Sequence, residues 1–145
     1  TLFDLPHAMS GAAALAGQAG VSDRCELASG SFFEAIPAGA DIYLLKSILH
    51  NWDDTQCGVI LQHCRRAMPD GARLIVVERV MPRRLSASAV DRAVARSDLN
   101  MLVGLAGRER TMDELASLLA NAGLRVARTG AAVREFTAIE AMPLR

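Results

Sequence analysis

The sequence has few aromatic residues and no excess of charge of either sign. Phe, Trp and Tyr make up 4% of the 145 residues, and 16 basic residues balance 16 acidic ones. A balanced charge creates no field that favours nucleic acid or an anionic membrane surface. No apolar run approaches the roughly 18 to 20 residues of a membrane span. We therefore expect a cytoplasmic protein that binds neither nucleic acid nor membranes.

Cysteine is also scarce, and the chain shows no leader. Cys25, Cys57 and Cys64 are an odd number without C-x-x-C spacing, which favours reduced, buried thiols over disulfides or a metal site. No metal-ligand cluster is visible, and none is expected. The chain begins at Thr1 inside an expected strand, without an initiator Met or a signal peptide. This start predicts a piece of a longer protein.

Short apolar runs alternate with amphipathic segments, which predicts an α/β fold with a largely parallel sheet. Asp41 to Lys46 is expected to be a buried strand, and Asp53 or Asp54 to cap the helix after it. Thr111 to Glu114 has the pattern of a capping box. The expected strands are 1–4, 24–28, 41–46 and 73–79, with a closing hairpin of 124–128 and 133–139; the expected helices are 7–19, 53–68, 89–103 and 111–122.

The most informative stretch is Leu44 to Asp54, where a strand leads into His50. Open α/β sheets hold ligands at the carboxyl ends of their strands. An imidazole there is a candidate general base, and a packed His that caps a turn is the alternative. Glu78 follows four apolar strand residues, and Glu109 precedes the capping box. Either carboxylate would orient the imidazole, unless Glu78 is an exposed strand-end charge and Glu109 part of a solvated cluster.

Other residues have two interpretations each. Asp4, at the end of the first strand, either accepts hydrogen bonds from a ribose or caps a helix. Lys46 either reaches a cofactor or extends into solvent, and Trp52 is expected to pack, with an adenine ring as a possible partner. His7 and His63 are expected to be surface residues.

The order and spacing of these motifs resemble the carboxyl-terminal part of class I S-adenosylmethionine (SAM)-dependent O-methyltransferases. The similar subgroup contains plant caffeic acid O-methyltransferases and bacterial polyketide and phenazine tailoring enzymes. The resemblance extends from Phe3-Asp4-Leu5-Pro6 through His50-Asn51-Trp52-Asp53-Asp54 and Val76-Val77-Glu78 to Arg108-Glu109-Arg110-Thr111.

The resemblance implies a role for each matching residue. It makes His50 the catalytic base, framed by Glu78 and Glu109, in methyl transfer from SAM to a hydroxyl of a small aromatic or polyketide-type acceptor. Ser31 stands where the family has Asp, and Asn51 where Asp is common. The implied cofactor contacts are Asp4, Ser31, Phe32 and Lys46, and the implied acceptor contacts are Asn51, Asp98 and Met101.

The resemblance also implies a Rossmann-like sheet of order 3-2-1-4-5-7-6 with helices on both faces. Residues 1–145 match only part of that catalytic domain. The central first strand, the Gly-rich SAM loop and the amino-terminal dimerisation domain would lie upstream, in a homodimeric full-length protein. Two unpaired edges would then remain within the sheet.

Two other functions fit parts of the sequence. A non-catalytic remnant or interaction module would keep the scaffold without the Gly-rich loop, but it gives no reason to retain His50, Glu78 and Glu109 together. A nicotinamide-dependent dehydrogenase shares the ribose-binding Asp but does not explain the blocks around His50 and Glu109.

Overall fold

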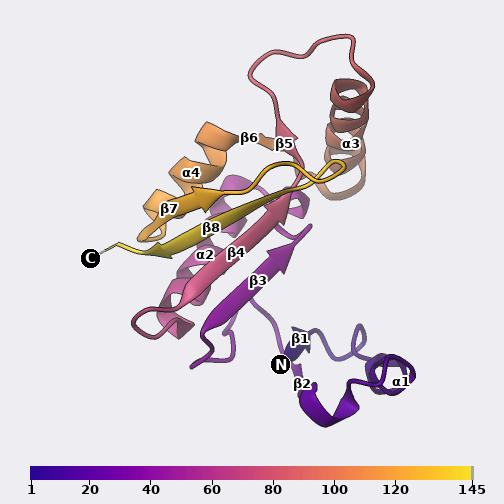
Figure 1. The fold of residues 1–145 in the computed structure, drawn as a ribbon, viewed down its shortest axis with the longest axis vertical. Coiled ribbons are helices and arrows are strands. Elements are labelled where there is room, and N and C mark those ends of the chain that lie inside the picture. Colours follow the sequence, from indigo (N-terminus) through magenta and orange to yellow (C-terminus); the bar gives the residue numbers. More distant parts are fainter. Residues whose placement is uncertain (145) are drawn as a thin grey trace.

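The computed structural model describes residues 1–144, in which strands and helices alternate (Figure 1). The strands are β1 (Leu2–Asp4), β2 (Leu27–Ser29), β3 (Ile42–Lys46), β4 (Arg73–Glu78), β5 (Val80–Met81), β6 (Arg110–Thr111), β7 (Leu124–Thr129) and β8 (Thr137–Pro143). The α-helices are α1 (Ala12–Gln18), α2 (Asp54–Ala67), α3 (Ala89–Leu105) and α4 (Met112–Asn121). Two short 3-10 helices, η1 (Ser22–Arg24) and η2 (Leu49–Asn51), complete the elements.

The sheet is divided. One part has the order β3-β4-β8-β7, in which β3 and β4 are parallel and β8 is antiparallel to both β4 and β7. A second part is the parallel pair β1-β2. Within residues 1–144 no strand pairing joins these two parts, and Figure 1 shows β1, β2 and α1 as a unit beside β3. The expectation of a central strand upstream of Thr1 stays a prediction.

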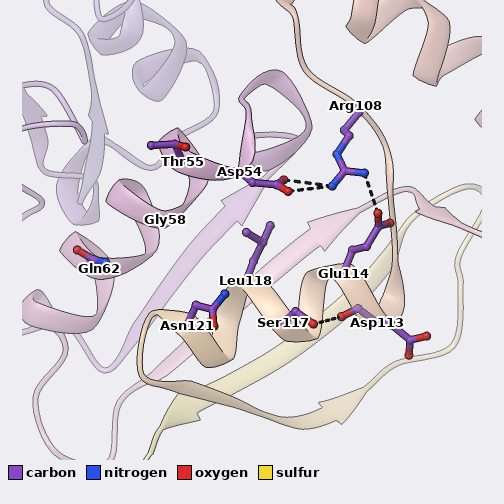
Figure 2. A pocket seen from close by; sticks show the side chains of 10 residues that line it. All are labelled: Asp54, Thr55, Gly58, Gln62, Arg108, Asp113, Glu114, Ser117, Leu118 and Asn121. Carbon is purple, nitrogen blue, oxygen red and sulfur yellow. Dashed lines mark hydrogen bonds and ion pairs between the residues drawn. The ribbon is translucent and has the colours of Figure 1, made fainter.

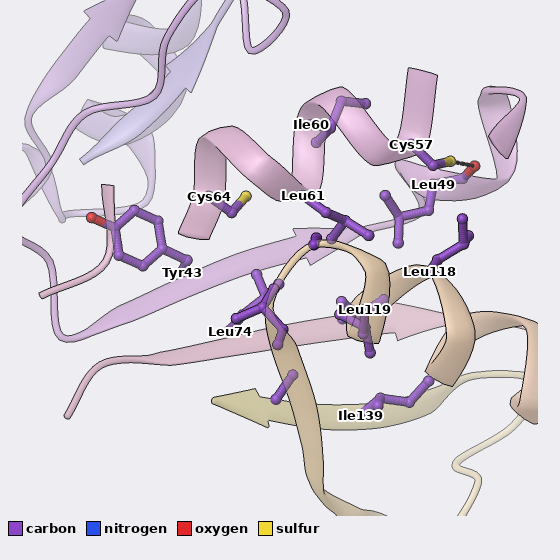
Figure 3. Close-up of a cluster of buried hydrophobic side chains, with 14 of the residues drawn as sticks. Tyr43, Leu49, Cys57, Ile60, Leu61, Cys64, Leu74, Leu118, Leu119 and Ile139 are labelled. Atoms are coloured by element: carbon purple, nitrogen blue, oxygen red, sulfur yellow. Dashed lines mark hydrogen bonds between the residues drawn. The ribbon is translucent and has the colours of Figure 1, made fainter. Parts of the chain in front are cut away.

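The hydrophobic core lies between the four-stranded part and the helices α2 and α4 (Figure 3). Leu74 and Val76 of β4 and Ile139 of β8 are fully buried against Ile60 and Leu61 of α2. Helices thus cover one face of these strands, which confirms the α/β fold class.

The opposite face is open at β3. Ile42 and Leu44 are each 63% exposed, whereas Tyr43, which points to the core, is buried. The prediction that 41–46 is a buried strand was therefore wrong for Ile42 and Leu44. The apolar run itself is present, but within the described residues no helix packs over its second face.

Local signals set the helix starts correctly. The Asp53 carboxylate accepts a hydrogen bond from the Gln56 amide at 2.8 Å, so Asp53 rather than Asp54 caps α2. The Thr111 hydroxyl accepts from the Glu114 amide, and the Glu114 carboxylate accepts in return from the Thr111 amide. The amino-terminal ends of α2 and α4 are both capping boxes.

Several boundaries differ from the prediction. The amino-terminal helix is only α1, because Gly11 before it has a φ of 86° and the preceding residues form turns. Residues 22–24 form η1, so the second strand is shorter and later than expected. His63 is half-buried, and its Nδ1 lies 2.9 Å from the Phe32 carbonyl oxygen, so its prediction as a surface residue was wrong. None of the helices in residues 1–144 is both long and apolar enough to cross a membrane.

Candidate active site

His50 lies just past the carboxyl end of β3, in η2. The chain turns there because Ser47 adopts a left-handed φ of 54°, while its amide still donates to the Val77 carbonyl of the neighbouring strand. His50 is only 8% exposed. The imidazole is thus buried at the strand end where ligands of open α/β sheets bind.

Glu78 ends β4, the parallel neighbour of β3, so its side chain lies next to the His50 segment. Its Oε1 accepts hydrogen bonds from the amides of Ile48 at 3.0 Å and Leu49 at 2.8 Å. Its Oε2 lies 3.6 Å from His50 Nδ1, an ion-pair distance too long for a hydrogen bond. Glu78 is 2% exposed, which excludes the exposed strand-end charge.

Glu109 approaches the same imidazole nitrogen from the segment that leads into β6. Its Oε1 lies 3.2 Å from His50 Nδ1 and also accepts from the Ser97 hydroxyl at 2.6 Å. The Glu109 amide donates to the Asp98 carboxylate at 2.8 Å, so α3 holds this residue at two points. Glu109 is 4% exposed, and the solvated-cluster alternative is excluded.

The two carboxylates favour a charged imidazole. The hydrogen bond with Glu109 raises the pKa of His50 above 6.5, and the negative charges of Glu78 and Glu109 add to this, although burial opposes it. Burial also raises the pKa of Glu78. The Oε2 atoms of Glu78 and Glu109 are buried without a hydrogen-bond partner among residues 1–144. Protonation of His50 would therefore offset part of their negative charge.

The side chains of His50, Glu78 and Glu109 also group closely enough to hold a cation. One possible ligand atom of each lies within 4.8 Å of the others. Imidazole and carboxylate are donor types that bind divalent cations. The fold thus joins residues that are 28 and 59 positions away from His50, and the expectation that the site needs no metal stays a prediction.

Arg108 and Arg110 make contacts near the site, and the sequence analysis gave neither residue a role. The Arg110 guanidinium is buried and donates to backbone carbonyls of the His50 segment, whereas the Arg108 side chain joins Asp54 to Glu114 in a pocket between α2 and α4 (Figure 2). A signal was present: side chains alternate along an extended segment, so Glu109 and its two Arg neighbours must point to opposite sides.

The candidate cofactor residues are only partly brought together. Asp4 and Ser31 lie close, because β1 and β2 are parallel and the Gly30 amide donates to the Asp4 carbonyl. The Phe32 ring packs edge-on against Phe33 and Trp52 in the partly buried rim of the core. Lys46 lies elsewhere, with its Nζ 4.8 Å from the centre of the Phe136 ring.

The candidate acceptor residues lie around the His50 segment. The Asn51 side-chain amide donates to the Ser47 carbonyl at 3.4 Å, and Asp98 accepts from the Glu109 amide. Met101, on α3, is half-buried and its carbonyl accepts from the Gly107 amide. Trp52 packs at 4.8 Å, centre to centre, against Phe33. The cofactor and acceptor roles of these residues stay predictions.

Comparison with known proteins adds a family to this geometry. Residues 1–125 match the model of the O-methyltransferase domain family. The chain is 43% identical over 145 residues to the O-demethylpuromycin-O-methyltransferase of Streptomyces alboniger, covering 99% of this chain and 38% of that protein.

Two solved structures show the same fold. The crystal structure of LaPhzM superposes with a TM-score of 0.91 at 39% identity, over 99% of this chain and 42% of the other. The O-methyltransferase NcsB1 from neocarzinostatin biosynthesis, in complex with SAM and 2-hydroxy-5-methyl naphthoic acid, superposes with a TM-score of 0.85 at 34% identity, over 98% and 40%. The chain spans about two fifths of the length of these relatives.

Proposed function

Because this chain belongs to the O-methyltransferase domain family, we propose that it is the carboxyl-terminal part of the catalytic domain of a SAM-dependent O-methyltransferase. The acceptor is a hydroxyl, of phenolic type, on a small aromatic or polyketide-type metabolite. The observation that carries this proposal is the buried His50, whose Nδ1 faces the carboxylates of both Glu78 and Glu109.

His50 acts as the general base. With Nδ1–H donated to Glu109, the neutral imidazole keeps its free lone pair on Nε2, which takes the proton of the acceptor hydroxyl. A phenol has a pKa near 10 and is a poor nucleophile while protonated, so the base is needed at neutral pH. Glu78 and Glu109 then stabilise the imidazolium. A positioned base of this kind contributes about 10² to 10⁴ in rate.

The residues at the ends of β1 and β2 fit the ribose and base of SAM. The exposed Asp4 carboxylate uses Oδ1 to accept from the Leu5 amide, which leaves Oδ2 free for a ribose hydroxyl. A Cβ at Gly30 would lie 2.8 Å from the Phe3 ring, so a larger residue there would displace the ring, whereas glycine lets the loop pass close to β1 and present Ser31 beside Asp4. When bound, SAM supplies an electrophilic sulfonium methyl group. Phe32 and Lys46 are further candidate contacts.

The full-length protein, as we propose it, contains an upstream strand between β1 and β3, followed by the Gly-rich SAM loop. The open edge of β3 and the exposed Ile42 and Leu44 support this. Leu99, Leu102 and Val103 leave an apolar face of α3 exposed, which supports its burial against an amino-terminal dimerisation domain. We infer that the full-length protein is cytoplasmic and forms a homodimer. Light scattering of the purified full-length protein tests the homodimer.

Methyl transfer by the full-length protein tests the function. Incubation with SAM and a panel of hydroxylated aromatic acids, naphthoates and polyketide phenols should yield a methyl ether with at least one acceptor. The His50→Ala variant should lose about 10² to 10⁴ of the turnover. His7→Ala is the matched control, because His7 is exposed and far from β3 in the chain. Equal turnover in the two variants would remove His50 from the mechanism.

A further inference from the structure

Arg110 is a buried cation outside the set of residues to which the proposed mechanism gives a role. It is 2% exposed, although arginine is almost never fully buried unless it is paired. Its Nε and Nη2 both donate to Asp54 Oδ1, at 2.9 and 2.8 Å. The carboxylate of Asp54 is itself largely exposed, so this ion pair alone does not account for the burial of the guanidinium.

The other contacts of Arg110 are with the backbone on either side of His50. Its Nη1 donates to the Leu49 carbonyl at 2.8 Å, and its Nη2 donates to the Trp52 carbonyl at 2.7 Å. These carbonyls bracket η2, the single turn that carries His50. One planar guanidinium thus fixes both ends of the turn, a geometry that a lysine ammonium cannot reproduce with one nitrogen.

The remaining backbone groups of this turn are held by other partners. Glu78 accepts from the amides of Ile48 and Leu49, and the Arg108 amide donates to the His50 carbonyl at 3.0 Å. Gly107 passes so close that a Cβ there would collide with the same carbonyl oxygen. The buried Cys57 thiol donates to the Leu49 and Trp52 carbonyls at 3.2 and 3.6 Å. Arg110 is the charged side chain that donates to the same two carbonyls, at shorter distances.

Neighbouring residues therefore fix the imidazole and its backbone separately. Glu109 points to His50 Nδ1, while Arg110, the next residue, points to the Leu49 and Trp52 carbonyls. Arg110 is anchored by the short pairing of β5 with β6, in which it pairs with Val80, and Glu109 directly precedes this strand. The segment of Glu109 and Arg110 thus holds both the imidazole of His50 and the backbone that carries it.

We propose that Arg110 is a positioning residue of the methyl transfer proposed above, which holds the His50 turn so that the imidazole stays hydrogen-bonded to Glu109. The inference depends on that function only for its effect on rate; the effect on the imidazole exists without any reaction.

The test measures the imidazole as well as the rate. The full-length protein is labelled with ¹³C-histidine, the His50 signal is identified by its loss in His50→Ala, and its pKa is measured by NMR titration alongside kcat against pH. The charged groups that line the space around His50 are Glu78, Arg79, Arg108, Glu109 and Arg110. From α3, Asp98 accepts from the Glu109 amide.

Arg110→Lys keeps the charge and loses the fork. Loosening of the turn weakens the bond from Nδ1 to Glu109, so the pKa of His50 should fall toward 6.5. The same variant should lower kcat about 100-fold, as expected for a displaced catalytic group. A purely electrostatic role predicts no change of the pKa in Arg110→Lys and a rise in Arg110→Gln, because a cation is lost there.

Leu74→Ala is the control for general loss of stability, since Leu74 is fully buried at the far end of β4. It should lower the thermal midpoint and leave the pKa of His50 unchanged. If Arg110→Lys does not fold, Asp54→Glu keeps the charge but moves the exposed anchor of the same guanidinium, and it should shift the pKa in the same direction. An unshifted or raised pKa in these variants overturns the proposal. A lowered pKa in a protein that transfers no methyl group would overturn the proposed function alone.

Discussion

Replacement of Glu78 separates two roles that one carboxylate combines. Its Oε1 holds the amides of Ile48 and Leu49, and its charge acts on His50. Glu78→Ala leaves both amides without an acceptor, and a buried unsatisfied donor costs about 1 to 3 kcal/mol. Two donors give about 2 to 6 kcal/mol, which corresponds to a thermal midpoint lowered by about 5 °C or more in a domain of this size.

Glu78→Gln keeps an acceptor for both amides and removes only the charge. At a pH above the folded-state pKa of His50, the thermal midpoint should therefore stay near that of the natural protein. The negative charge of Glu78 contributes to the raised pKa of His50, so that pKa should fall toward 6.5 in the variant. Since His50, as the proposed base, acts when it is deprotonated, the rising limb of kcat against pH should move to lower pH.

The raised pKa of His50 also makes the stability of the fold depend on pH. A raised pKa means that His50 stabilises the fold fully below pH 6.5 and that this contribution is lost as the pH rises through its higher folded-state value. Melts followed by circular dichroism from pH 6 to 9 should show this loss, and Glu78→Gln should reduce it. If Glu78→Ala and Glu78→Gln melt together, or if the rising limb of kcat does not move in Glu78→Gln, the division of roles is refuted.

Three further predictions follow from the same contacts. Glu109→Gln should lower the pKa of His50 more than Glu78→Gln does, because the hydrogen bond with Glu109 is the largest cause of the raised pKa; NMR titration measures both. Gly107→Ala should lower the free energy of unfolding by at least about 1 to 3 kcal/mol, since its Cβ would displace the His50 carbonyl. A lowered thermal midpoint measures this loss. Methyl transfer should persist after dialysis against EDTA, and a loss restored by zinc would instead assign a metal to the cluster.

The sequence predicted best what depends on local chemistry. The capping boxes at Asp53 and Thr111 need only residues three positions apart, and both helices begin where these patterns place them. Burial of β3 depends instead on what packs over it, which the apolar run of Ile42 and Leu44 does not contain. The first helix was overestimated because alanine content alone did not account for Gly11 at its start.

The sequence predicted the side chains of the candidate site but not the contacts that hold its backbone. His50, Glu78 and Glu109 were identified from strand ends and a family resemblance, and the fold brings them into contact. The role of Arg110 toward the Leu49 and Trp52 carbonyls left no such trace, because backbone acceptors carry no residue-type signal. Only the alternation of side chains around Glu109 pointed to it.

The two halves of the proposed site differ in what holds them. The group of His50, Glu78 and Glu109 is held by contacts within the described residues, since Glu78 and Arg110 connect the His50 turn to β4 and β6. Asp4 and Ser31 belong to the β1-β2 pair, which no strand pairing joins to that sheet. A displacement of about 1 Å between reacting groups costs about 10² in rate. The strand proposed between β1 and β3 therefore determines whether this base can act on an acceptor held beside SAM, and residues 1–145 alone should bind SAM far more weakly than the full-length protein. Calorimetric titration compares the two, and micromolar binding by residues 1–145 would show that the β1-β2 pair is already held in place without that strand.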